Sequence, residues 1–108
     1  MPVEKYKSLY TEMSNIFPSS SGVPYILWIG QKSGREKHGI RVKVSVPQEN
    51  KFLTFSVSSS PELLSKTKIS NKDISLIKSW IISNKDVLIK FWNSELDTVQ
   101  FGKKLKRI

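Results

Sequence analysis

Hydrophobic residues near the N-terminus recur at spacings of three and four, which is the period of an α-helix. Polar residues occupy the positions between them. Pro18 and the serine- and glycine-rich stretch that runs to Pro24 end this pattern, because proline cannot continue the helical hydrogen bonds. We predict a helix over residues 4–17, within an N-terminal helical segment 1–17. Its apolar positions are Tyr6, Leu9, Tyr10, Met13, Ile16 and Phe17.

Three patterns typical of β-strands follow. Residues 25–29 form a continuous apolar run that ends at Gly30, as in a strand that is covered on both faces. Residues 40–46 and 52–58 alternate between apolar and polar side chains, and a short turn segment separates them. We therefore predict an antiparallel three-stranded meander over residues 25–58.

The strongest helical pattern lies in the last third of the chain. Ser70 and Asp73 have the spacing of a capping box, and the apolar residues after them fall within one arc of a helix. We predict one helix over residues 71–93, with Trp80 and Ile81 in the core. The alternative is two helices broken at Asn84, which in a continuous helix lies inside the apolar arc and needs a hydrogen-bond partner.

Together these patterns predict one α+β domain over residues 1–108, in the order helix, three strands, helix, with a short basic tail over residues 96–108. The 108 residues suffice for one modest core. No apolar run is long enough to span a membrane, and no secretion signal is evident, so we expect a cytoplasmic protein of a bacterium or a phage-infected host. The chain contains no cysteine, which excludes disulfides and thiolate metal sites.

The net charge of +9, from 18 lysines and arginines against 9 acidic residues, favours a polyanionic partner. Such a partner is RNA, a ribonucleoprotein or an acidic protein surface. The alternative is that the excess lysine only keeps the protein soluble. His38 is the only histidine, and the dispersed carboxylates show no metal-ligand spacing, so we predict neither a metal nor a cofactor.

Positive charge is concentrated between residues 32 and 43. If a helix covers one face of the sheet, the alternation places Arg41 and Lys43 on the opposite face. Trp28 either joins them there, as an indole that stacks bases beside cations, or is covered by the first helix or the tail. The predicted nucleic-acid-binding residues are Lys32, Arg35, Lys37, His38, Arg41, Lys43 and Trp28, with Lys103, Lys104, Lys106 and Arg107 of the tail as auxiliary contacts.

One catalytic hypothesis is compatible with these residues. A metal-independent endoribonuclease needs a base near a 2′-hydroxyl and cations around the phosphate, which His38 and its neighbours Arg35, Glu36, Lys37 and Arg41 can supply. The simpler interpretation is a solvated loop that contains a histidine. We favour the loop and predict a non-enzymatic protein.

Two resemblances bear on the fold. The predicted order of elements, with Gly34 and His38 before the alternating strand, resembles the double-stranded-RNA-binding domain, which implies a positive loop that grips the RNA backbone. Over about residues 25–95, the series Trp80, Asn84, Leu88 and Trp92 resembles small uncharacterised bacterial domains found near toxin–antitoxin genes. That second resemblance implies the biology of mobile elements.

The sequence thus favours a basic non-enzymatic module that binds RNA or the RNA-handling surface of a ribonucleoprotein. The small size, the charge and a composition without alanine but rich in lysine, serine and isoleucine favour a phage or mobile-element inhibitor of the anti-CRISPR type. One alternative is a ribonuclease toxin that uses His38. The other is an antitoxin or adaptor that presents Ile82, Ile89 and the tail to an acidic partner.

Overall fold

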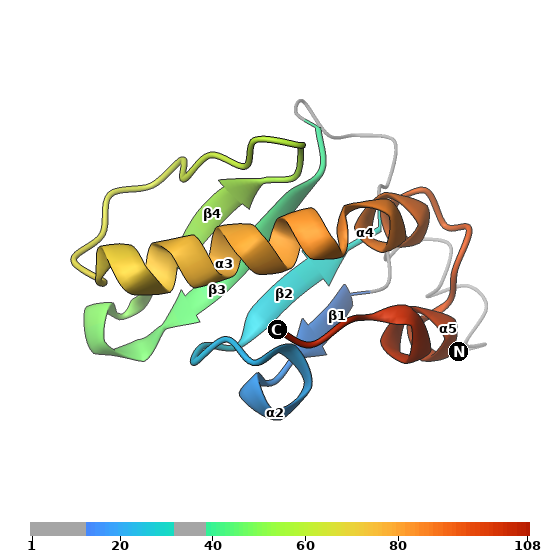
Figure 1. Ribbon diagram of the computed structural model, residues 1–108, viewed down its shortest axis with the longest axis horizontal. Helices are drawn as coiled ribbons and strands as arrows, with labels where there is room; N and C mark the ends of the chain where they lie inside the picture. Colours follow the sequence, from blue (N-terminus) through green and yellow to red (C-terminus); the bar gives the residue numbers. More distant parts are fainter. Residues whose placement is uncertain (1–12, 32–38) are drawn as a thin grey trace, which may run out of the picture.

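The computed structural model describes residues 13–31 and 39–108. Within these ranges the chain is an α+β fold whose four strands form one antiparallel sheet in the order β1-β2-β3-β4 (Figure 1). The α+β class is confirmed, but the predicted three-stranded sheet is wrong because a strand precedes it. The strands are β1 (Met13–Ile16), β2 (Leu27–Gly30), β3 (Arg41–Val46) and β4 (Lys51–Ser56).

Strand β1 lies where we predict the end of the N-terminal helix, so the prediction is wrong for residues 13–16; residues 1–12 lie outside the described part. The burial of β1 alternates, because Ser14 and Ile16 are buried whereas Asn15 is exposed. Without β1, strand β2 would be the edge of the sheet, so the pairing with β1 supplies partners for backbone groups of β2 that would otherwise be open. Pro18, expected to end a helix, instead begins the short helix α2 (Pro18–Ser21), where its missing N–H costs nothing.

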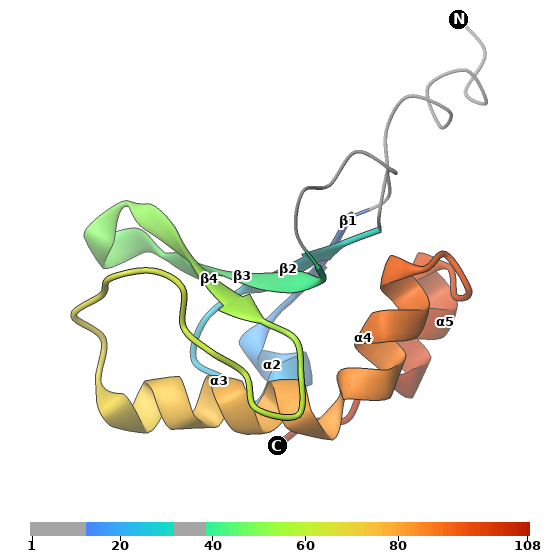
Figure 2. The ribbon, with the colours of Figure 1, turned by 90° about the horizontal axis from the view of Figure 1, so that it is seen from above.

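The described α-helices all lie on one side of the sheet (Figure 2), and a short 3-10 helix, η1 (Pro47–Glu49), connects β3 to β4. The side chains that alternate toward this side form the core, as the periodicity of β3 and β4 predicts. Strand β2 is buried at alternate positions, so its apolar run is not covered equally on both faces. The fully buried sheet residues are Leu27, Ile29, Val42, Val44, Val46, Leu53 and Phe55.

The segment 71–93 is two helices, so the prediction of one continuous helix is wrong and the alternative break at Asn84 is right. Helix α3 (Asn71–Ser83) ends there, and helix α4 (Lys85–Trp92) leaves in another direction (Figure 2). The N-terminus of α3 is as expected, because the Ser70 side chain accepts a hydrogen bond from the Asp73 backbone N–H at 3.1 Å. Trp80 and Ile81 are fully buried, as predicted.

The segment 96–108 is not simply a basic tail. It contains helix α5 (Thr98–Lys104), which begins with a capping box between Asp97 and Gln100. The ring of Phe101 stacks on that of Phe91 with 4.3 Å between the centroids, which attaches α5 to α4. Apolar contacts therefore outweigh the repulsion among the lysines of this segment and dock it on the helical layer.

Candidate nucleic-acid interface

The outer face of the sheet, away from the helices, carries the candidate site. Residues opposite each other in an antiparallel pair point to the same face. Trp28 lies opposite Lys43, which in turn lies opposite Thr54. Arg41 and Phe52 occupy the same face, two positions along their strands from Lys43 and Thr54. The register therefore gives the first of the two arrangements that the sequence leaves open, with the indole opposite Lys43 and on the same face as Arg41.

Two aromatic rings meet on this face. The centroids of Trp28 and Phe52 are 6.3 Å apart, and the ring planes are inclined by 83°, which is a favourable edge-to-face contact. Phe52 is 53% exposed, although large apolar side chains on a sheet are usually covered. The Nε1 atom of Trp28 is covered, and no acceptor in the described chain lies within hydrogen-bond distance of it. Trp28 thus sits as a partly buried ring with its neighbour Phe52 largely open to solvent.

The two cations on the outer face have no described carboxylate as an ion-pair partner. The salt bridge found among the described residues joins Lys51 to Glu49 at 3.5 Å, at the turn between β3 and β4. Lys43 is exposed and Arg41 is partly exposed. Their charges are therefore not neutralised by neighbouring described acids, and they can attract an anion.

The structure brings together only part of the predicted site. Lys32, Arg35, Lys37 and His38 lie outside the described residues, so the ribonuclease hypothesis for His38 stays a prediction. The tail cations are separated from the outer face, because Lys103 and Lys104 belong to α5 in the helical layer and Lys106 and Arg107 follow it (Figure 2).

Phe52 is not among the residues that we predict for the site. The signal is nevertheless in the sequence, because Phe52 precedes Thr54 by two positions in an alternating strand and therefore shares its polar face. An aromatic side chain on the polar side of a strand is a departure from the binary pattern, and such departures mark functional surfaces.

No helix in the described ranges is both long enough and apolar enough to cross a membrane. Among the same residues, no cluster of three or more histidine, cysteine or acidic side chains could hold a metal ion. No protein-family model matches the chain, and no curated protein or solved structure matches it significantly. Both family resemblances therefore stay predictions, and the function must be argued from the surface itself.

Proposed function

We propose that this protein is a non-enzymatic module that binds single-stranded RNA, free or within a ribonucleoprotein, on the outer face of its sheet. The observation that carries the proposal is the pairing of Trp28 with Lys43 across neighbouring strands, with Phe52 against the indole. Proteins bind single strands by stacking bases on aromatic side chains while nearby cations hold the backbone. The anti-defence setting remains a prediction from composition.

The arrangement favours unpaired bases over a duplex. A base must leave its partner and its stack before a side chain can lie against its face, so aromatic side chains on an open sheet suit single strands. Each stacked base contributes about 1–3 kcal/mol, and each phosphate contact adds salt dependence. In this proposal Trp28 and Phe52 contact bases, while Arg41 and Lys43 contact phosphates.

The electrostatic part is tested by charge reversal on two sides of the molecule. The variant Arg41→Glu/Lys43→Glu and the control Lys103→Glu/Lys104→Glu each lower the net charge from +9 to +5. Binding of a labelled oligonucleotide is measured by anisotropy over a series of salt concentrations. We expect the sheet variant to weaken binding and to flatten the slope of log K against log salt by about 0.7 for each lost contact. The α5 control should change both quantities less, and equal losses in the two variants would contradict the proposed site.

The contribution of base stacking is tested with two apolar residues of similar exposure. Phe52 is 53% exposed and Leu64 is 46% exposed, so truncating either side chain leaves the core intact. Phe52→Ala should weaken binding of an oligonucleotide about 5-fold or more, which corresponds to the lower end of one stacked base. Leu64→Ala should leave the affinity unchanged. Equal affinities for both variants would mean that the exposed ring of Phe52 does not stack on bases.

A specific observation supports one second candidate, the antitoxin or adaptor function. A hollow of about 440 Å³ beside the break between α3 and α4 is lined by the apolar Ile82 and Val87. Its other walls are two cations, one acid and two serines: Lys85, Lys106, Asp86, Ser59 and Ser83. Ile82 is 52% exposed there, and an apolar patch beside two cations and one acid suits an acidic protein partner. If Lys85→Glu/Lys106→Glu removes polyanion binding while the sheet variant retains it, this candidate replaces the first.

A further inference from the structure

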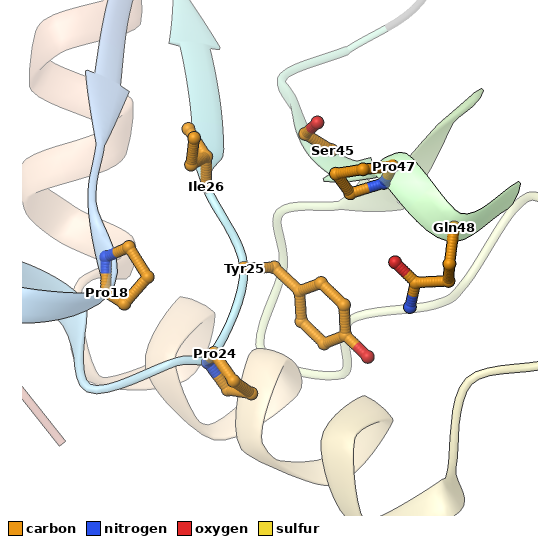
Figure 3. Close-up of a pocket in the computed structure, with 7 residues that line it drawn as sticks. All are labelled: Pro18, Pro24, Tyr25, Ile26, Ser45, Pro47 and Gln48. Carbon is orange, nitrogen blue, oxygen red and sulfur yellow. The ribbon is translucent and has the colours of Figure 1, made fainter. Parts of the chain in front are cut away.

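A second hollow opens at the end of the sheet, where β2 begins and β3 ends, between the outer face and the helical layer to which Pro18 belongs. Its volume is about 410 Å³. Figure 3 shows the lining residues, with the ring of Tyr25 between Pro24 and Gln48. Pro24 and Tyr25 line it from the segment before β2, and Pro47 and Gln48 line it from the segment after β3.

The hollow is continuous with the proposed RNA-binding surface. Ser45 of β3 and Ile26, which immediately precedes β2, line it, and each lies two residues along the chain from a member of the Trp28–Lys43 pair. Two residues of a strand span about 6.6 Å, so the hollow begins one side-chain row away from Trp28. Ser45 donates its backbone N–H to the Ile26 carbonyl at 2.9 Å, which keeps the two strands joined at this point.

The walls of the hollow are held in place before any ligand binds. The Tyr25 hydroxyl donates to Asp73 Oδ2 at 2.8 Å, which ties the ring to the first turn of α3. Burial, and then this hydrogen bond, raise the pKa of Tyr25, so the hydroxyl keeps its proton and its partner. Pro18, Pro24 and Pro47 add rings whose backbone φ angle is fixed. A preformed site of this kind loses little conformational entropy on binding.

The residues that line the hollow limit which kind of ligand it can bind. The walls are apolar or aromatic, while the Ser45 hydroxyl and the Gln48 amide, which also contacts the Tyr25 hydroxyl, carry uncharged donors and acceptors. No cation lines the hollow among the described residues, so a phosphate does not suit it. A proline-rich peptide prefers a groove with several aromatic rings, whereas Tyr25 is the one aromatic residue in the described lining.

We infer that this hollow receives the base of a nucleotide next to the one stacked on Trp28, in the same RNA strand. The inference rests on the proposed function and adds base selectivity to it. The flat base lies against Tyr25 and the prolines, and its edge reaches Ser45 and Gln48. Because stacking alone is tolerant of sequence, the hydrogen bonds in the hollow give the surface its preference among bases.

The test compares affinities for oligo(U), oligo(A) and oligo(C) of equal length. The variant Ser45→Ala/Gln48→Met removes the Ser45 hydroxyl and the Gln48 amide while nearly keeping the volume of the hollow. We expect the natural chain to prefer one oligonucleotide over the others about 10-fold or more, as good base-edge contacts give about 1–3 kcal/mol of discrimination. The variant should reduce that ratio at least about 5-fold, with an unchanged salt slope because no charge is altered. Circular dichroism checks that the variant folds.

The matched control is Thr54→Val, which removes a hydroxyl from the same face but outside the hollow. It should keep the full preference. A natural chain without base preference, or a double variant that retains it, would overturn the hollow as a base site while leaving the proposed RNA binding intact. If no oligonucleotide binds, both proposals fail together. Saturable binding of a proline-rich peptide that Tyr25→Ala abolishes would likewise overturn the assignment to a base.

Discussion

Asn84 joins three parts of the chain, and its replacement tests how the C-terminal segment is held. The side chain is 1% exposed at the break between α3 and α4. Its Nδ2 donates to the carbonyls of Trp80 and Lys106, each at 3.0 Å. Its Oδ1 accepts from the Lys106 backbone N–H at 2.7 Å. The buried amide of Asn84 thus holds both the backbone N–H and the carbonyl of Lys106, which lies 22 positions further along the chain.

The cost of removing this amide follows from the three hydrogen bonds. Each contributes about 0.5–1.5 kcal/mol net, and a buried group left without a partner costs more. We expect Asn84→Ala to lower the free energy of unfolding by about 2–4 kcal/mol. Because the Lys106 backbone can turn to water if it is released, the value should lie toward the lower end of this range.

Urea denaturation measures the cost in two backgrounds, the full chain and a chain shortened by residues 106–108. In the shortened chain Asn84 keeps only its bond to the Trp80 carbonyl, so Asn84→Ala should cost only about 1 kcal/mol. The difference between the backgrounds is the coupling energy, expected at about 1–3 kcal/mol. The exposed Asn71→Ala is the control and should stay within about 0.5 kcal/mol of the parent. An identical cost of Asn84→Ala in both backgrounds would refute the role of Asn84 in holding Lys106.

Three further changes probe other parts of the fold. Trp80→Ala removes a fully buried ring and should cost about 3–5 kcal/mol in thermal or urea unfolding, so a variant that melts within a few degrees of the parent would contradict the core. Gly22 has a φ angle of 84°, and a Cβ there would lie 2.1 Å from the Ile108 carbonyl oxygen. Gly22→Ala should therefore release the last residues, seen as faster exchange of the Ile108 amide proton that donates to the Ser21 carbonyl. A hydrogen bond from the Thr67 hydroxyl at 2.7 Å is the main cause that lowers the pKa of Glu49. The contribution of Glu49 to stability is present above the ordinary glutamate range and disappears as the pH falls through the lowered pKa, so Glu49→Gln should make unfolding less sensitive to pH in that acidic window.

Local patterns predict the parts of the fold that are decided within a few residues. The alternation of β3 and β4 identifies the strands and places Arg41 and Lys43 away from the core. The cap at Ser70 depends on residues three positions apart, so its spacing predicts the start of α3 correctly. Trp80 and Ile81 are buried as their place in the apolar arc predicts. In each case the sequence pattern and the structural feature that it predicts both involve residues close together in the chain.

Strand β1 shows where local spacing fails. The positions of Met13 and Ile16 fit a helical period, yet the segment pairs with β2, whose partner residues lie 11 to 17 positions further along the chain. Hydrophobic periodicity indicates which faces of a segment are apolar. The pairing of its backbone depends instead on whether another segment presents N–H and C=O groups to it. Short segments carry little intrinsic preference, so tertiary contacts decide their conformation.

The candidate site likewise combines features that the sequence determines with features that only the tertiary structure decides. The sequence by itself determines the excess of positive charge and the outward direction of Arg41 and Lys43. It also places Phe52 on the polar face of its strand. Only the tertiary structure decides that Trp28 lies opposite Lys43, because the register between two strands is not encoded in either strand alone. The break at Asn84 is decided in the same way, since its buried amide finds its partners in Trp80 and in the distant Lys106. Hydrophobic periodicity and charge are properties of neighbouring residues, whereas register, helix breaks and hollows arise from contacts between residues far apart in the chain.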